Sequence, residues 1–157
     1  MKHRQGPYPT PGATKQWAAN IAMPLVAVVS GEITTNVTSA LLGAAKEPGL
    51  ISDAWLSVAG SGKDDTNTLQ VALDVTINGT TCLTTNPIIA HVSGEAAQQK
   101  TTKTDSDTGV TQAVIDTDAN SVAQGDVIGY SLTLTRTASP TTEMNNVAVV
   151  VEFEPSF

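Results

Sequence analysis

The amino-acid sequence predicts an all-β fold, a sandwich or barrel of about eight antiparallel strands. Segments rich in Val, Ile, Leu and Thr recur from residue 49 to residue 154, alternate apolar with polar side chains over part of their length, and are bounded by Gly, Asn, Asp or Pro. Hydrophobic residues make up 40% of the chain and charged residues 15%, which is typical of a folded domain. Aromatic residues reach only 4%, so the core must be aliphatic.

The first 22 residues are predicted to form an arm that precedes a β-sandwich domain of residues 23–157. Pro7, Pro9 and Pro11 alternate with Tyr8 and Thr10, a pattern that excludes helix and favours an extended, polyproline-like conformation. Such an arm can bind across a neighbouring molecule. The residues expected to contact a partner are Tyr8, Pro9, Pro11, Lys15 and Trp17, with Trp17 as the anchor.

The first predicted strands of the domain span residues 23–30, 33–42 and 50–59. Residues 38–46 also fit a short helix with Ser39 as its N-cap, but the β-branched run that continues into this segment favours a strand. In the third strand, alternation places Leu50, Ser52, Ala54, Leu56 and Val58 on one face, which we expect to be buried. Trp55 lies on the other face, either as a core residue of a strand covered on both sides, which we favour, or as an anchor between subunits.

The second half of the domain continues the strand pattern. The dipeptide Asn78-Gly79 is the strongest hairpin signal in the chain. The polar residues 93–109 are expected to form a long loop, or an excursion that carries a brief helical turn. The predicted strands are residues 69–77, 81–84, 87–92, 110–117, 127–136 and 143–154.

The charge distribution argues against nucleic acid as a partner. The net charge is -7, and residues 1–20 contain three of the eight basic residues and no acid. An acidic body lacks the basic patch that phosphate contacts need. The start Met1-Lys2-His3-Arg4 is followed by Gly and Pro and not by an apolar run, so we expect no signal peptide and no membrane association.

No constellation of catalytic residues is visible, so we expect a protein that is not an enzyme and that uses no cofactor. Cys82 is the single cysteine, which excludes an intrachain disulfide and indicates a small buried apolar residue. His3 and His91 have no partner at metal-ligand spacing.

Two acidic segments offer alternating oxygen ligands for a cation. They are residues 105–109 (DSDTG) and 116–120 (DTDAN). Neither completes a calcium-binding loop, since the sixth position is Val110 in the first and Ser121 in the second where the loop needs Gly. Asp and Asn are also the residues that turns prefer, so we expect turns and no metal site.

Several of these segments resemble the jelly-roll domains of tailed-bacteriophage virion proteins, which include capsid decoration (cement) proteins and head fibres. The resemblance covers residues 23–155 and is carried by residues 49–58 (GLISDAWLSV), 74–80 (DVTINGT), 132–136 (LTLTR) and 147–154 (VAVVVEFE). It implies a jelly-roll-like sandwich that forms a trimer or another oligomer and clamps the major capsid protein. It also implies a location on the outside of the capsid after synthesis in the host cytoplasm.

The function expected from this likeness is decoration and stabilisation of a bacteriophage capsid. The alternative is a head- or tail-fibre module that recognises a host receptor or glycan, although the chain has few aromatic residues to stack on sugars. Ala148 and Val150, together with Ile128, Tyr130, Leu132 and Leu134, predict more apolar surface than a lone sandwich needs. This surplus favours a cyclic oligomer, a homotrimer by the resemblance.

Overall fold

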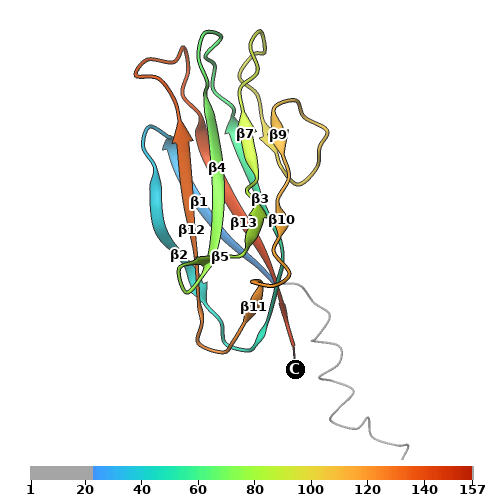
Figure 1. The fold of residues 1–157 in the computed structure, drawn as a ribbon. Coiled ribbons are helices and arrows are strands. Elements are labelled where there is room, and N and C mark those ends of the chain that lie inside the picture. Colours follow the sequence, from blue (N-terminus) through green and yellow to red (C-terminus); the bar gives the residue numbers. More distant parts are fainter. Residues whose placement is uncertain (1–22, 157) are drawn as a thin grey trace, which may run out of the picture.

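The protein is an all-β sandwich in a computed structural model that describes residues 23–156 (Figure 1). This part of the chain contains no helix. One sheet contains β1 (Met23–Glu32), β13 (Asn145–Pro155), β3 (Gly49–Gly60), β11 (Ser121–Val122) and β8 (Lys100–Thr101). The other contains β2 (Val37–Ala44), β12 (Val127–Thr135), β4 (Gln70–Ile77), β7 (Ile88–Ala90), β9 (Val110–Thr111) and β5 (Thr80–Thr81), while β6 (Leu83–Thr85) pairs with β10 (Val114–Ile115).

The strand order is that of a jelly roll. The first sheet runs β1-β13-β3 and continues with the short strands β8 and β11, and the second runs β2-β12-β4-β7. All pairings are antiparallel. The first four long strands therefore alternate between the two sheets, and the last two strands, β12 and β13, pair with β2 and β1. This two-sheet arrangement, in which the short strands β8 and β11 both pair with β3, confirms the predicted sandwich and its jelly-roll character.

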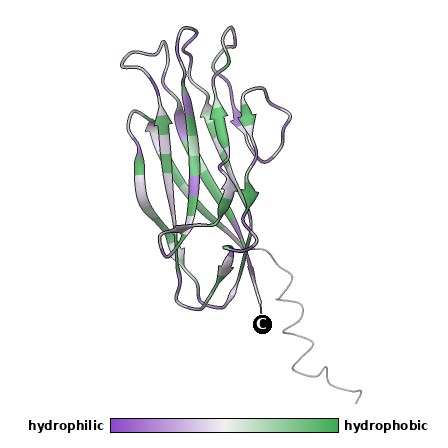
Figure 2. Cartoon of the chain, in the orientation of Figure 1, coloured by the Kyte–Doolittle hydropathy of each residue, from purple (hydrophilic) through white to green (hydrophobic). Residues whose placement is uncertain are grey.

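The core lies between the two sheets and is aliphatic. In β4 the residues alternate strictly between buried and half-buried, as expected for a strand with one face in the core. Figure 2, coloured by hydropathy, shows hydrophobic residues along the strands of both sheets. In β13, Val147, Val149 and Val151 have no exposed surface, and their neighbours on the other face are more accessible. The sequence predicts this alternation with a period of two for both strands, so the predicted core-facing sides of β4 and β13 are confirmed.

The hairpin predicted at Asn78-Gly79 joins β4 to β5. Both residues have positive φ, 52° and 84°, as this tight turn requires. The Asn78 side chain also contacts the start of β12, because its Oδ1 accepts from the Val127 amide at 2.9 Å and its Nδ2 donates to Asp126 at 2.7 Å. One turn residue therefore links neighbouring strands at the end of the sheet.

Two sequence-based choices near the start of the domain have clear outcomes. Residues 37–44 form β2 and not a helix, so the strand interpretation is confirmed. In β3, the predicted inner face is wrong at its first residues, because Ile51 is fully buried and Leu50 is 45% exposed. The cause is a register shift opposite Glu152 and Phe153, which leaves Ser52 without a partner on β13 and reverses the alternation.

Residues 91–109 form a long excursion without helix, so of the two predicted alternatives the long loop is confirmed and the brief helical turn is not formed. The short strand β8 lies inside it, and the side chain of Lys100 is buried. The Lys100 Nζ donates to Glu95 Oε2 at 2.7 Å and to the carbonyls of Thr108 at 2.7 Å and Ala90 at 3.0 Å. This buried cation holds both ends of the excursion together, a role that the polar composition alone did not reveal.

The single strand predicted for residues 110–117 is two short strands. β9 pairs with β7, and β10 pairs with β6, so the chain leaves the main sheet between Thr111 and Val114. Alternation continues across the break, because half-buried Ala113 and Ile115 still pack against the core. Periodicity alone therefore could not locate the break.

Candidate interaction surface

The outer faces of the two sheets differ in chemistry. On the β2-β12-β4-β7 sheet, the outward residues of the central strands are mainly hydroxyl-bearing or acidic, and include Asp74, Thr76, Ser131, Thr133 and Thr135. On the β1-β13-β3 sheet they are mainly apolar along the middle of the strands, and include Val26, Val28, Trp55, Ala148 and Val150. We call this second group the apolar face.

The apolar face is formed by the register of three adjacent strands. Val26 lies opposite Val150, and Val150 lies opposite Trp55, so one row of large apolar side chains crosses β1, β13 and β3. Side chains in directly opposed positions touch. The next row contains Val28 and Ala148. Val26 is 58% and Val28 60% exposed, so no part of residues 23–156 covers this end of the face.

Charged residues border the apolar face on one side. The Lys103 Nζ lies 4.1 Å from the centroid of the Trp55 ring, 2.6 Å from Asp53 Oδ2 and 3.6 Å from Glu152 Oε1. The hydrogen bond to Asp53 raises the pKa of Lys103, with a further contribution from Glu152. Trp55 is half-buried and lies outside the core, so the expectation that it is a core residue is wrong. The Lys103 side chain covers part of the Trp55 ring and leaves the rest of the ring accessible.

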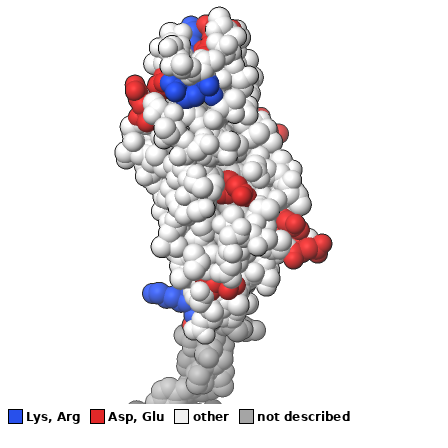
Figure 3. Space-filling model, turned by 60° about the vertical axis from the view of Figure 1, so that its left-hand side comes forward, with Lys and Arg blue, Asp and Glu red and all other residues white. Residues whose placement is uncertain are grey.

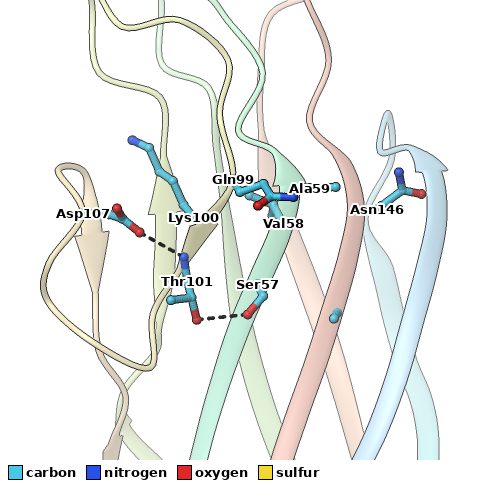
Figure 4. Close-up of a pocket in the computed structure, with 9 residues that line it drawn as sticks. Ser57, Val58, Ala59, Gln99, Lys100, Thr101, Asp107 and Asn146 are labelled. Atoms are coloured by element: carbon cyan, nitrogen blue, oxygen red, sulfur yellow. Dashed lines mark hydrogen bonds between the residues drawn. The ribbon is translucent and has the colours of Figure 1, made fainter.

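A shallow hollow of about 450 Å³ lies further along the same outer face (Figure 4). The Ser57 hydroxyl donates to Thr101 Oγ1 at 3.0 Å, and the Thr101 amide donates to Asp107 Oδ2 at 3.3 Å. The lining is completed by Val58, Ala59, Gln99, Lys100, Asn146 and Ala148. The hollow is therefore more polar than the valine rows beside it.

Part of the apolar surface predicted for assembly is core instead. Ile128, Tyr130 and Leu132 are at most 6% exposed and point between the sheets, so their assignment to an assembly surface is wrong. Ala148 and Val150 lie on the apolar face, as the alternation of β13 predicts. The sequence did not indicate Val26 and Val28, because a strand of nearly continuous apolar residues does not reveal which face is buried.

The flank that carries the edge strand β2 shows few charges (Figure 3). Leu41 on β2 is 68% exposed, and Val127 at the start of β12 is 45% exposed. Exposed large apolar side chains thus occur at the edge of one sheet and on the outer face of the other. Such grouped exposure is a common property of surfaces that bind other proteins.

The partner-binding residues predicted in the arm, Tyr8, Pro9, Pro11, Lys15 and Trp17, lie outside the described residues, as does His3. Cys82 is fully buried, as predicted, and its Sγ lies 3.4 Å from the Val75 carbonyl. Burial raises the pKa of this thiol to about 11, with a smaller contribution from Asp74. The thiol is therefore protonated at neutral pH.

His91 follows the end of β7, and its Nε2 lies 3.0 Å from Asp65 Oδ1. A hydrogen bond from the Gly94 amide is the main cause that lowers the pKa of Asp65 to about 2, and His91 and Lys63 contribute. The buried Asp64 beside it accepts hydrogen bonds from Thr66, Asn67 and Thr137. These contacts connect three loops. Both carboxylates are engaged in structural hydrogen bonds, so neither is positioned as a reactive group.

The two acidic segments are turns. The Asp116 carboxylate accepts from the Asp118 amide at 3.0 Å, and Asp105 lies exposed in the long excursion. Within residues 23–156, no group of three or more His, Cys, Asp or Glu side chains is placed to hold a metal ion. The same part of the chain contains no helix long and apolar enough to cross a membrane.

Comparison of the chain with protein-family models, with curated proteins and with solved structures found no match. The functional argument therefore depends on the fold and on the apolar face.

Proposed function

We propose that this chain is a non-enzymatic structural protein that decorates and stabilises a bacteriophage capsid as a homo-oligomer, with a trimer favoured. The apolar face is the observation that carries this proposal. Val26, in a row with Val150 and Trp55, and Val28, in the next row with Ala148, are more than half exposed, and contact of such an apolar face with water is unfavourable. A second copy of the chain would cover it, because closed symmetric assembly is the usual way to bury a repeated apolar patch.

The fold supports the same role. A jelly roll is a rigid antiparallel scaffold whose loops gather at its two ends, so one end can contact a capsid while the sheet faces contact sister subunits. The titratable groups of the loops at Asp64, Asp65 and Lys100 are engaged in hydrogen bonds that fix loop shape. These features fit a protein that acts through its rigid shape and its binding surfaces and not through catalysis.

The test of assembly is sedimentation velocity at micromolar concentration in low and high salt. We expect an oligomer under both conditions, because apolar contacts are insensitive to screening. The double variant Val26→Lys, Val28→Lys should sediment as a monomer. The matched control Thr133→Lys, Thr135→Lys adds the same charge to exposed positions of the other sheet and should leave the oligomer intact. A monomeric wild-type protein would remove the support for the proposal.

The test of decoration is co-sedimentation with assembled capsids of the encoding phage from which outer proteins have been removed. Wild-type protein should pellet with these capsids at a fixed ratio to the major capsid protein. Serum albumin under the same conditions controls for trapping. Failure of an oligomeric wild-type protein to pellet would contradict the capsid role and leave the oligomer as an established property.

The second candidate function is a fibre module that binds a host glycan, and the hollow beside the apolar face favours it. Hydroxyl, amide and carboxylate groups of Ser57, Gln99 and Asp107 line this hollow, and such groups hydrogen-bond sugar hydroxyls. In a Trp17→Phe variant, Trp55 is the remaining tryptophan and lies two residues from Ser57 on the same face. Saturable change of its fluorescence with an oligosaccharide would favour this function, and no change across a panel would count against it.

A further inference from the structure

Both sheets end in a long strand with a free edge on the same flank of the sandwich. β1 pairs with β13 on one side, and β2 pairs with β12 on one side. Within residues 23–156, no strand pairs with the other side of either one. The two strands are joined by residues 33–36 and lie beside each other (Figure 1). This flank therefore presents two rows of main-chain N–H and C=O groups that are free to pair.

The chain covers the corresponding edges of the opposite flank with its own short strands. β8 and β11 pair with the side of β3 that faces away from β13, and β9 pairs with the outer side of β7. Single bonds extend this cover, because the Thr102 amide donates to the Leu56 carbonyl at 2.9 Å and the Ile51 amide to the Asn120 carbonyl at 3.0 Å. The two flanks thus differ, and the one formed by β1 and β2 is open.

The free edges of β1 and β2 are uncharged over almost their whole length. Residues 23–31 and 37–45 contain no charged side chain. β1 has ten residues and β2 has eight. Edge strands that stay unpaired in natural proteins are usually short or carry charges, and a long apolar edge is a template for another strand. The composition of this flank therefore favours a partner strand over water.

We propose that β1 of one copy of the chain pairs with β2 of a second copy, so that the sheets of neighbouring subunits become continuous. This inference rests on the homo-oligomer proposed above and names its contact. β1 and β2 run in opposite directions, since a short connection joins them. Rotation about an axis parallel to the strands preserves these directions, so the two edges meet antiparallel, as the long strands of this structure do. Each copy gives one edge and receives one, and such a contact closes into a ring.

Charge favours a second copy as the partner. The net charge of the chain is -7, so two copies repel each other where their acidic surfaces approach. The flank of β2 shows few charges (Figure 3), and two copies meet there with little repulsion. Val28 and Leu41 are both more than half exposed, and the neighbours of Leu41 on β2 pack against the core. Both side chains therefore point outward and share one face of the continuous sheet, where they shield each other from water.

The test is chemical cross-linking between two full-length variants that each carry one added cysteine. Val28→Cys places a thiol on β1 and Leu41→Cys places one on β2, both at exposed positions. The variants are distinguished by a tag, refolded together at micromolar concentration and treated with a short bis-maleimide. We expect several-fold more covalent dimer of unlike chains in the mixture than dimer of like chains from either variant alone. The wild type controls for Cys82, which is fully buried.

A matched control replaces Leu41→Cys by Thr111→Cys, an exposed position on β9 at the opposite flank. Its mixture with Val28→Cys should give only the background of random collisions. Val26→Cys serves as a second β1 variant if Val28→Cys lowers the melting temperature, and the same result is expected from it.

The outcomes separate this contact from the homo-oligomer itself. Abundant dimer of like chains from Val28→Cys alone would overturn the proposal in favour of a two-fold pairing of β1 with itself. An oligomer in sedimentation whose mixture cross-links no more than the Thr111→Cys control would also overturn it, and would leave the homo-oligomer standing. A monomer in sedimentation without cross-links would contradict both.

Discussion

The ammonium group of Lys103 lies over the indole ring of Trp55, 4.1 Å from its centroid, although the two residues are 48 positions apart in the chain. Asp53, two residues before Trp55 on β3, binds the same ammonium at 2.6 Å. The long excursion after β7 is thus fastened to the outer face of β3. This contact limits the apolar face on one side and leaves Val26 and Val28 as its open part.

Alanine substitutions at two neighbouring residues of β3 should distinguish a core position from a position on the apolar face. Leu56→Ala removes a fully buried side chain and should lower the free energy of unfolding by about 2–5 kcal/mol. Trp55→Ala removes a half-buried side chain on the outer face and should cost less than the roughly 3–5 kcal/mol of a buried tryptophan. Urea denaturation measures the free energy of unfolding of both variants. A loss for Trp55→Ala as large as that for Leu56→Ala would mean that the chain itself covers the apolar face.

Two glycines with positive φ should respond differently to alanine. At Gly62 a Cβ atom would lie 2.6 Å from Leu69 Cδ2 and 2.8 Å from the Thr142 carbonyl oxygen, and φ is 69°. At Gly79 φ is 84° but no atom lies within 4 Å. Gly79→Ala should therefore cost only the backbone strain of about 1–2 kcal/mol, and Gly62→Ala clearly more. Equal melting temperatures for the two variants would contradict this reading of the loop.

Acid should weaken the loop contacts of Asp64. Burial raises the pKa of its carboxyl group, but hydrogen bonds from Thr137, Thr66 and Asn67 outweigh this and lower it from 3.8 to about 2. A pKa lowered by folding stabilises the folded state above the unfolded value, and this stabilisation is lost as the pH falls towards 2. The wild-type melting temperature should therefore decrease between about pH 4 and pH 2.

Asp64→Asn isolates this contribution. The variant should melt at a lower temperature at pH 7 and should lose less on acidification, because the titrating group is gone. Asp65, whose pKa is also lowered to about 2, should retain part of the dependence of the melting temperature on pH. The exposed control Asp105→Asn should follow the wild type at every pH. Parallel curves for the wild type and Asp64→Asn would show that Asp64 is not a source of the acid sensitivity.

Cys82 should be inert in the native protein. Its side chain has no exposed surface, and burial raises the pKa of the thiol to about 11, so reactive thiolate is absent at pH 8. We expect a thiol reagent such as dithionitrobenzoate to label the protein only at the rate of unfolding and at once in denaturant. Rapid labelling of the folded protein at a rate independent of added denaturant would require a local opening near β5 and β6.

The sequence by itself determined the all-β class, the long strands β4, β12 and β13 and the hairpin at Asn78-Gly79. Each is a local property, since alternation with a period of two selects the buried face and only Asn or Gly readily adopts the positive φ of this turn. The burial of Cys82 was also predictable, because it lies in the apolar and Thr-rich stretch of residues 80–85 and the chain has no second cysteine for a disulfide.

Only the tertiary structure decided which residues form the apolar face and the free edges of β1 and β2. A register shift on β3 reversed the burial of Leu50 and Ile51, and the pairing of β13 with both β1 and β3 aligned Val26, Val150 and Trp55. The partner strands come from opposite ends of the chain. Strand register depends on contacts between residues far apart in sequence, so a local pattern cannot specify which exposed side chains meet.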